Sequence, residues 1–164
     1  MQTFGPKSSE PIAWMRQAID LAIEKMRAGE GGPFGAIIVR DGQIVGRGWN
    51  RVTSTNDPTA HAEVNAIRNA CQLLNTFSLN GCAIYCSCQP CPMCHCALLW
   101  ARIDDIFYAA TAADAAAAGF DDRTFRDQLC LPLESQTIPL KQLPCSQATA
   151  PFHAWSQLED RVEY

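Results

Sequence analysis

The sequence has few positive charges, few histidines and no long apolar run. No stretch approaches the roughly 18 unbroken apolar residues of a membrane-spanning helix, so a membrane protein is not expected. The first ten residues contain no apolar segment typical of a secretion signal, and we therefore expect a cytoplasmic location. Lysine and arginine total 13 against 17 aspartates and glutamates, a formal net charge of -4, which disfavours nucleic acid as a partner.

Cysteine, in contrast, is abundant. There are nine cysteines, and five of them lie between Cys86 and Cys96. Nine thiols cannot all pair, and a cytoplasmic compartment is reducing, so metal binding or buried thiols are favoured over a disulfide scaffold. Four cysteines outside the cluster are expected to be ordinary buried thiols: Cys71, Cys82, Cys130 and Cys145.

Helical and strand patterns alternate along the chain. Apolar residues at spacings of three and four predict a helix over 12–26, closed by Gly29, and an Asp41-Gly42 turn joins two predicted strands. The strands are predicted over 34–40, 43–48, 82–86 and 103–110, with an extended segment at 137–143. Further helices are predicted over 57–74, 90–101, 111–119 and 149–164. This alternation, with no repeat or linker, predicts a single layered α/β domain over residues 1–164.

One histidine, one glutamate and two cysteines carry the expected chemistry. His61 and Glu63 lie in the first turn of one predicted helix, and Cys91 and Cys94 lie in the first turn of another. Cysteines three residues apart share a helix face, and a helix N-terminus favours the thiolate that binds metal. His61, Cys91 and Cys94 would leave the fourth tetrahedral position of a zinc ion open to water, as in catalytic sites. Glu63 lies about 200° around the helix from His61, which suits an acid/base better than a ligand.

The cysteine cluster is also compatible with two less favoured kinds of metal site. The spacing of Cys88, Cys91 and Cys94 resembles the start of an iron–sulfur motif, but Leu98 occupies the position of the fourth cysteine. Four cysteines could instead hold a structural zinc, with His61 a core residue. The combination of H-x-E with a later P-C-x-x-C, however, is the recorded pattern of zinc-dependent base deaminases, and it favours the catalytic site.

Four longer motifs extend this likeness. GGPFG at 31–35, NDPTAHAE at 56–63, SCQPCPMC at 87–94 and AGFDD at 118–122 resemble bacterial guanine deaminases of the cytidine deaminase-like superfamily. The second and third motifs are shared with tRNA adenosine deaminases, whereas AGFDD and the terminal Glu163-Tyr164 are of the guanine type. The resemblance implies a three-layer α/β/α fold around a mixed sheet, one zinc per active site, and hydrolysis of guanine to xanthine and ammonia.

The resemblance also implies roles for individual residues. Zinc would lower the pKa of its bound water, and Glu63 would take the water proton, pass it to the ring nitrogen, and later protonate the departing amine. The family likeness places four substrate contacts: Asn50, Asp122, Tyr164 and, as a wall for the ring, Phe34. It further implies a homodimer in which a C-terminal segment, about 148–164, is exchanged and closes the partner's site, so that Tyr164 would act in trans.

The sequence departs from the family pattern at two places and leaves several substrates open. Gln89 stands where the family usually has glutamate, and because glutamine keeps an acceptor we expect little functional change. His95 and Cys96 replace small apolar residues and are expected to pack. Cytosine, cytidine, a triazine or adenosine in tRNA are alternative substrates, because small changes in a pocket redirect specificity. A non-catalytic zinc-binding module is the alternative from another class, and it would leave Glu63 without a role.

Overall fold

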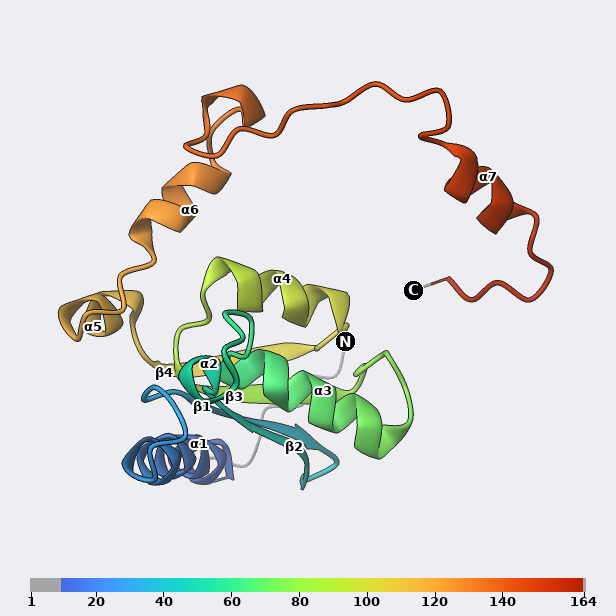
Figure 1. Cartoon of the computed structure of the whole chain (residues 1–164). Coiled ribbons are helices and arrows are strands. Elements are labelled where there is room, and N and C mark those ends of the chain that lie inside the picture. The colour runs from blue at the N-terminus through green and yellow to red at the C-terminus, as the bar shows by residue number, and fades with distance from the viewer. Residues whose placement is uncertain (1–9, 164) are drawn as a thin grey trace, which may run out of the picture. The chain divides into compact units, whose positions relative to one another are not determined.

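The computed structural model describes residues 10–163, which form two compact units that divide after Asp122. The first unit contains the sheet and the helices around it (Figure 1). Its elements are α1 (Glu10–Arg27), β1 (Gly35–Arg40), β2 (Gln43–Trp49), α2 (Val52–Thr55), α3 (Ala62–Leu74), β3 (Cys82–Cys88), α4 (Pro92–Trp100), β4 (Asp105–Ala110) and α5 (Ala112–Ala117). None of the described helices is long and apolar enough to cross a membrane.

The four strands form one mixed sheet in the order β2-β1-β3-β4. Strand β1 runs antiparallel to both β2 and β3, whereas β3 and β4 are parallel, which requires the crossover through α4. Asp41 and Gly42 both have positive φ, 51° and 72°, as the predicted tight turn between β1 and β2 requires. Because β3 and β4 are parallel, their carboxyl ends meet at one edge, where β3 leads into α4 and β4 leads into α5.

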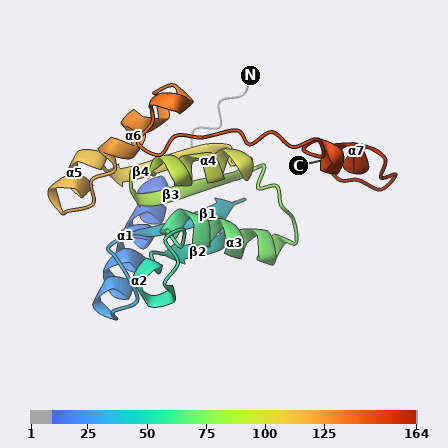
Figure 2. The same cartoon turned by 45° about the horizontal axis from the view of Figure 1, so that its top comes forward.

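The two central strands, β1 and β3, are covered on both faces, so the unit has three layers. Alternate residues of β1 and β3 divide between two apolar clusters because side chains along a strand point to opposite faces. Ile37 and Tyr85 pack with α1, whereas Ile38 and Ile84 pack with α3 and α4. Both views show α1 on one side of the sheet and α3 and α4 on the other (Figures 1 and 2). The α/β/α sandwich around a mixed sheet is therefore confirmed.

Helix α3 lies unusually close to β2 because β2 contains glycines. A Cβ atom at Gly48 would lie 2.1 Å from the carbonyl oxygen of Ala62 and 2.3 Å from the backbone nitrogen of Ala66. Any larger residue at position 48 would push away the first turn of α3. The glycine thus fixes the helix end that carries His61 and Glu63 against the sheet.

The second unit differs most from the sequence predictions. It contains α6 (Arg123–Leu129), which was not predicted, a 3₁₀ turn (Leu133–Ser135) and α7 (Ala150–Ser156). The predicted terminal helix therefore ends at Ser156 instead of continuing to 164, and the segment 137–143 forms no strand. Short helices and lone strands need a packing partner, and apolar side chains here are exposed, among them Ile138, Leu143 and Phe152 at 84%, 89% and 73%.

Candidate metal and catalytic site

Two helix N-termini bring the three predicted ligands together. His61 is the N-cap of α3 and Cys91 is the N-cap of α4, and neither side chain caps its own helix. The Nδ1 atom of His61 lies 3.6 Å from the Sγ of Cys91 and 3.5 Å from the Sγ of Cys94, and all three ligand atoms lie within 4.8 Å of one another. A nitrogen and a sulfur on one tetrahedral zinc, at about 2.1 Å and about 2.3 Å, lie about 3.6 Å apart. The residues present therefore fit a zinc ion.

The metal-free cluster holds one thiolate. A hydrogen bond from Cys94, with further help from His61, lowers the pKa of Cys91 to about 4 against the opposing effect of burial. The same hydrogen bond and burial raise the pKa of Cys94, so Cys94 holds the remaining thiol proton. The hydrogen bond to Cys91 also raises the pKa of His61. A metal that binds here must displace the thiol proton of Cys94 but finds Cys91 already ionised.

Glu63 is a buried carboxyl group beside this cluster. Only 8% of its surface is exposed, and burial raises its pKa above the usual value, with a further contribution from the Cys91 thiolate. Hydrogen bonding to Cys94 and the charge of His61 act in the opposite direction. A carboxylate whose charged form is penalised in this way is a stronger base than a solvent-exposed one, which suits a proton carrier. Cys86, for which the sequence predicts no role, is one of the buried groups close to it.

Asn50 is held in one orientation at the end of β2. Its side-chain oxygen accepts hydrogen bonds from the backbone N–H groups of Gly32, at 3.1 Å, and Val52, at 3.3 Å. A Cβ atom at Gly31 would lie 1.9 Å from the Asn50 carbonyl oxygen, so glycine is required there. Within residues 10–163 the Asn50 side-chain nitrogen donates to no protein group, although the residue is only 8% exposed. Asn50 therefore offers a hydrogen-bond donor.

The end of β2 is bonded to the start of α3, which places Asn50 near the cluster. The backbone N–H of Arg51 donates to the carbonyl oxygen of Ala60 at 2.9 Å. The side-chain nitrogen of Asn65 donates to the carbonyl oxygens of Trp49, at 2.9 Å, and Ala60. These bonds link the end of the strand that precedes Asn50 to the helix that begins after His61.

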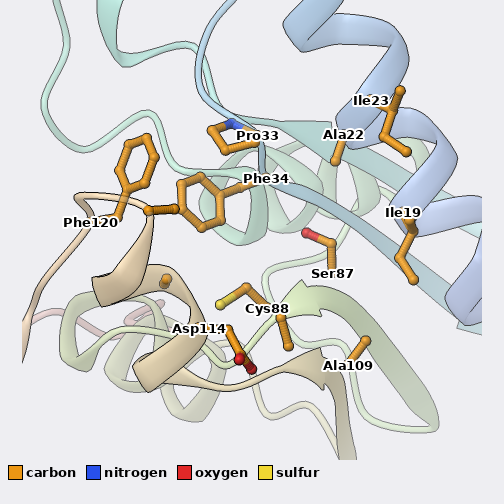
Figure 3. Close-up of a pocket in the computed structure, with 13 residues that line it drawn as sticks. Ile19, Ala22, Ile23, Pro33, Phe34, Ser87, Cys88, Ala109, Asp114 and Phe120 are labelled. Atoms are coloured by element: carbon orange, nitrogen blue, oxygen red, sulfur yellow. The ribbon is translucent and has the colours of Figure 1, made fainter.

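Phe34 lies beside Asn50 and against a second aromatic ring. Its ring contacts that of Phe120 edge to face, with centroids 4.9 Å apart at 88°. Figure 3 shows the two rings side by side along a cavity of about 310 Å³, which is also lined by Cys88 and Asp114. The sequence motif AGFDD contains Phe120, but its contact with Phe34 depends on α5 packing across the strand ends, which the sequence pattern did not indicate.

The other two predicted substrate contacts are Asp122 and Tyr164. Asp122 is half-buried, and its charge and that of Glu63 both raise the pKa of the Cys88 thiol, after the larger effect of burial. Asp122 and Glu63 therefore both lie close enough to Cys88, at the carboxyl end of β3, to act on its thiol. Tyr164 lies outside the described residues.

The other cysteines behave partly as predicted. All nine are free, so a disulfide scaffold is absent, and Cys82 is buried as expected. The predictions of buried thiols at Cys130 and Cys145 are wrong, because the second unit leaves both exposed. His95 and Cys96 are also exposed, contrary to the expected packing role, because they lie on the face of α4 that points away from the sheet.

Comparison with known proteins identifies the fold and the cluster. Residues 8–110 match the family model of the cytidine and deoxycytidylate deaminase zinc-binding region. The chain belongs to this deaminase family. It is thus a zinc-dependent deaminase by descent, and His61, Cys91 and Cys94 form its candidate zinc site.

Two relatives of this chain are named for different substrates. Guanine deaminase of Bacillus subtilis is 49% identical over 92% of this chain and 97% of its own. The X-ray structure of that enzyme superposes with a TM-score of 0.90, covering 93% of this chain and 97% of the other. A tRNA-specific adenosine deaminase of Aquifex aeolicus is 47% identical, but over 53% of this chain and 59% of its own. The likeness to the guanine deaminase thus extends into the second unit.

Proposed function

We propose that the chain hydrolyses guanine to xanthine and ammonia. The observation that carries the proposal is the match to a guanine deaminase over nearly the whole chain, including the AGFDD segment, combined with the His61, Cys91, Cys94 and Glu63 constellation. The reaction replaces the exocyclic amine of guanine by the oxygen of water. It needs a bound nucleophile, a proton carrier and a pocket for the planar base, and the first unit offers a candidate for each.

We further propose that His61, Cys91 and Cys94 are the zinc ligands. Their distances match a tetrahedral ion, and three protein ligands leave one position free, as in catalytic zinc sites. Zinc in such a site is a Lewis acid that makes water nucleophilic near neutral pH. The protein's own contribution is to hold the three ligand atoms at two adjoining helix N-termini before any metal binds.

Glu63 is the proposed acid/base. Its carboxylate oxygen would accept a proton from water and pass it to the ring nitrogen next to the carbon under attack. It would then take the proton of the newly added hydroxyl group and deliver it to the amine, which departs as ammonia while the carbonyl forms. Burial and the raised pKa support this role, because a more basic carboxylate accepts a proton more readily. Each proton taken up by Glu63 is returned, so the carboxylate is regenerated in every cycle.

The proposed pocket uses Asn50, Phe34 and Asp122. Because the Asn50 oxygen is bound to Gly32 and Val52, its free nitrogen would donate to an acceptor on the base, such as a keto oxygen or an unprotonated ring nitrogen. The apolar ring of Phe34 would lie against the purine, and Asp122 would accept N–H groups of the substrate. An aminated base without a matching acceptor would leave the buried Asn50 donor unpaired, at a cost in affinity.

We also propose that the active form is a cytoplasmic homodimer in which the C-terminal segment, about 148–164, is exchanged and Tyr164 closes the partner's site. The exposed apolar side chains of the second unit support an oligomer, because patches of this kind are usually covered in the assembled protein. Free cysteines throughout the chain are consistent with a reducing compartment. The homodimer and the cytoplasmic location are proposals separate from the proposal about the substrate.

Ammonia release from a panel of substrates tests the proposed activity. The panel contains guanine, guanosine, adenine, cytosine, cytidine, a triazine and an adenosine-containing tRNA stem-loop, each with zinc-loaded protein and with Glu63→Gln protein as the control. We expect turnover of guanine to exceed that of every other substrate. The net charge of -4 argues against the stem-loop. Turnover of the stem-loop without turnover of guanine would overturn the substrate assignment, and no turnover with zinc bound would favour a binding module.

A further inference from the structure

Gln89 lies between the proposed metal loop and the helix that leads to Asp122. It follows β3 and precedes the Pro90-Cys91 segment, and its side chain is partly buried. Its side-chain oxygen accepts a hydrogen bond from the backbone N–H of Ala112, the first residue of α5, at 3.2 Å. Its own backbone N–H donates to the carbonyl oxygen of Ala110 at 2.8 Å. One residue thus bonds to the last residue of β4 and to the first residue of α5.

Two neighbouring contacts strengthen the same junction. The Cys88 thiol lies 3.6 Å from the carbonyl oxygen of Thr111 and can donate to it. Thr111 and Asp114 form a capping box at the start of α5, with the Asp114 carboxylate accepting from the Thr111 backbone N–H at 2.7 Å. The capping box supplies acceptors for the backbone N–H groups of Thr111 and Asp114. The backbone N–H of Ala112 instead donates to the side-chain oxygen of Gln89.

Helix α5 in turn carries residues of the proposed pocket. After Ala117 the chain folds back, and the backbone N–H of Phe120 donates to the carbonyl oxygen of Ala115 at 2.9 Å. This turn places the Phe120 ring against Phe34 beside the cavity (Figure 3), and Asp122 follows two residues later. A shift of the start of α5 would therefore move both Phe120 and Asp122 relative to the strand ends that carry the metal ligands.

We propose that Gln89 is a positioning residue that couples the metal-binding loop to α5 and so sets the distance between the zinc site and Asp122. This inference rests on the proposed function for its kinetic consequence, although the link itself is structural. Glutamine supplies the required acceptor without adding a second carboxylate next to Asp114 at the same helix end. Position 89 needs an acceptor, and a charge there is dispensable.

Three variants separate this role from a general effect on stability. Gln89→Met keeps the length of the side chain but removes the acceptor, Gln89→Glu restores an acceptor, and Gln72→Met is a matched control on the exposed side of α3. In Gln89→Met we expect KM for guanine to rise about 5- to 10-fold, the effect of losing one hydrogen bond, with kcat and bound zinc little changed. For Gln89→Glu and Gln72→Met we expect a KM for guanine within about twofold of that of the original protein.

Two further measurements test the route of the effect. In the Asp122→Asn background, Gln89→Met should change KM by less than about twofold, because residues that act through one another are not additive. Amide hydrogen exchange at Ala112, followed by NMR in zinc-loaded protein, should accelerate in Gln89→Met and not in Gln89→Glu. The exchange measurement needs no substrate, so it tests the link even if guanine is not turned over.

Several outcomes would overturn the inference. The first is that Gln89→Met changes neither KM nor the exchange of the Ala112 amide. The second is loss of zinc from that variant, and the third is that Gln89→Glu fails to restore KM. The fourth is that Gln89→Met raises KM by the same factor with Asp122 present and with Asp122 replaced by asparagine. Absence of guanine turnover in the original protein would contradict the proposed function alone.

Discussion

The side-chain oxygen of Asn50 accepts a hydrogen bond from the backbone N–H of Gly32 at 3.1 Å, so the amide of Asn50 can only donate to a ligand. Asparagine is often treated as able to bind either a donor or an acceptor. Here the neighbouring backbone has removed that ambiguity, and the absence of a side chain at Gly31 allows the close approach. The orientation of one amide thus limits which edges of a base the proposed pocket can accept.

Replacing Asn50 by aspartate tests this orientation. Asn50→Asp preserves shape and keeps acceptors for Gly32 and Val52, but it replaces the free donor by an acceptor. We expect KM for guanine to rise at least about 10-fold while zinc content and the unfolding midpoint change little, because one buried hydrogen bond to the ligand is lost. Asn69→Asp is the control, since Asn69 is exposed and its side-chain nitrogen donates to the backbone carbonyl oxygen of Arg47. An unchanged KM in Asn50→Asp would remove Asn50 from the pocket.

Replacing Glu63 by glutamine should abolish most of the activity without loss of metal. A general acid/base contributes about 10²- to 10⁴-fold, and Glu63→Gln keeps the size of the side chain but cannot carry the proton. We expect kcat to fall by about 10³-fold or more, with about one zinc per chain by metal analysis. Glu134→Gln, in the exposed 3₁₀ turn, should match the original protein. Retained turnover in Glu63→Gln would exclude the proposed role.

Removal of any one proposed ligand should abolish stable zinc binding. His61→Ala, Cys91→Ala and Cys94→Ala each leave two protein ligands, which is fewer than catalytic zinc sites use. After dialysis against a chelator, we expect these variants to retain less than about 0.2 zinc per chain. Cys96→Ala changes an exposed cysteine of the same helix and should retain the metal. Loss of zinc from Cys96→Ala to the same extent would point to a different ligand set.

The thiolate at Cys91 predicts an unusual pH dependence in metal-free protein. Because the pKa of Cys91 is lowered to about 4, its thiolate is fully formed above about pH 5.5 and is lost only as the pH falls through 4. Alkylation of Cys91 by iodoacetamide, followed by peptide mass spectrometry, should therefore change less than about twofold between about pH 6 and 8. A free cysteine of pKa about 8.5 would slow roughly 100-fold over the same interval. Zinc should protect Cys91, and a tenfold decrease in rate per pH unit would contradict the lowered pKa.

The C-terminal segment should affect catalysis more than metal binding. Deletion of residues 158–164 leaves the first unit and its three candidate ligands intact, so about one zinc per chain should remain. We expect guanine turnover to fall about 10-fold or more because the proposed closure of the pocket excludes water. Light scattering would report whether the protein is a dimer before and after the deletion. Unchanged kinetics after the deletion would exclude C-terminal closure.

Much of the site could be predicted because its signals are local. A histidine before one helix and two cysteines three residues apart at the start of another are readable from the order of residues, and geometry brought them together at 3.5 and 3.6 Å. The layered fold followed from alternation of strands and helices, since each apolar face must be covered. The errors concentrate in the second unit, where short segments have little packing of their own and local patterns predict poorly.

The sequence by itself predicted the chemistry of this protein: one histidine, one glutamate and two thiols, in a pattern with a known use. The tertiary structure alone decided the orientation of Asn50, the contact of Phe34 with Phe120 and the bond from Gln89 to the start of α5. Each of these joins residues 18 or more positions apart, except for the local bond from Asn50 to Val52. Such contacts depend on how strands and helices pack, and packing geometry is not encoded in any local run of residues.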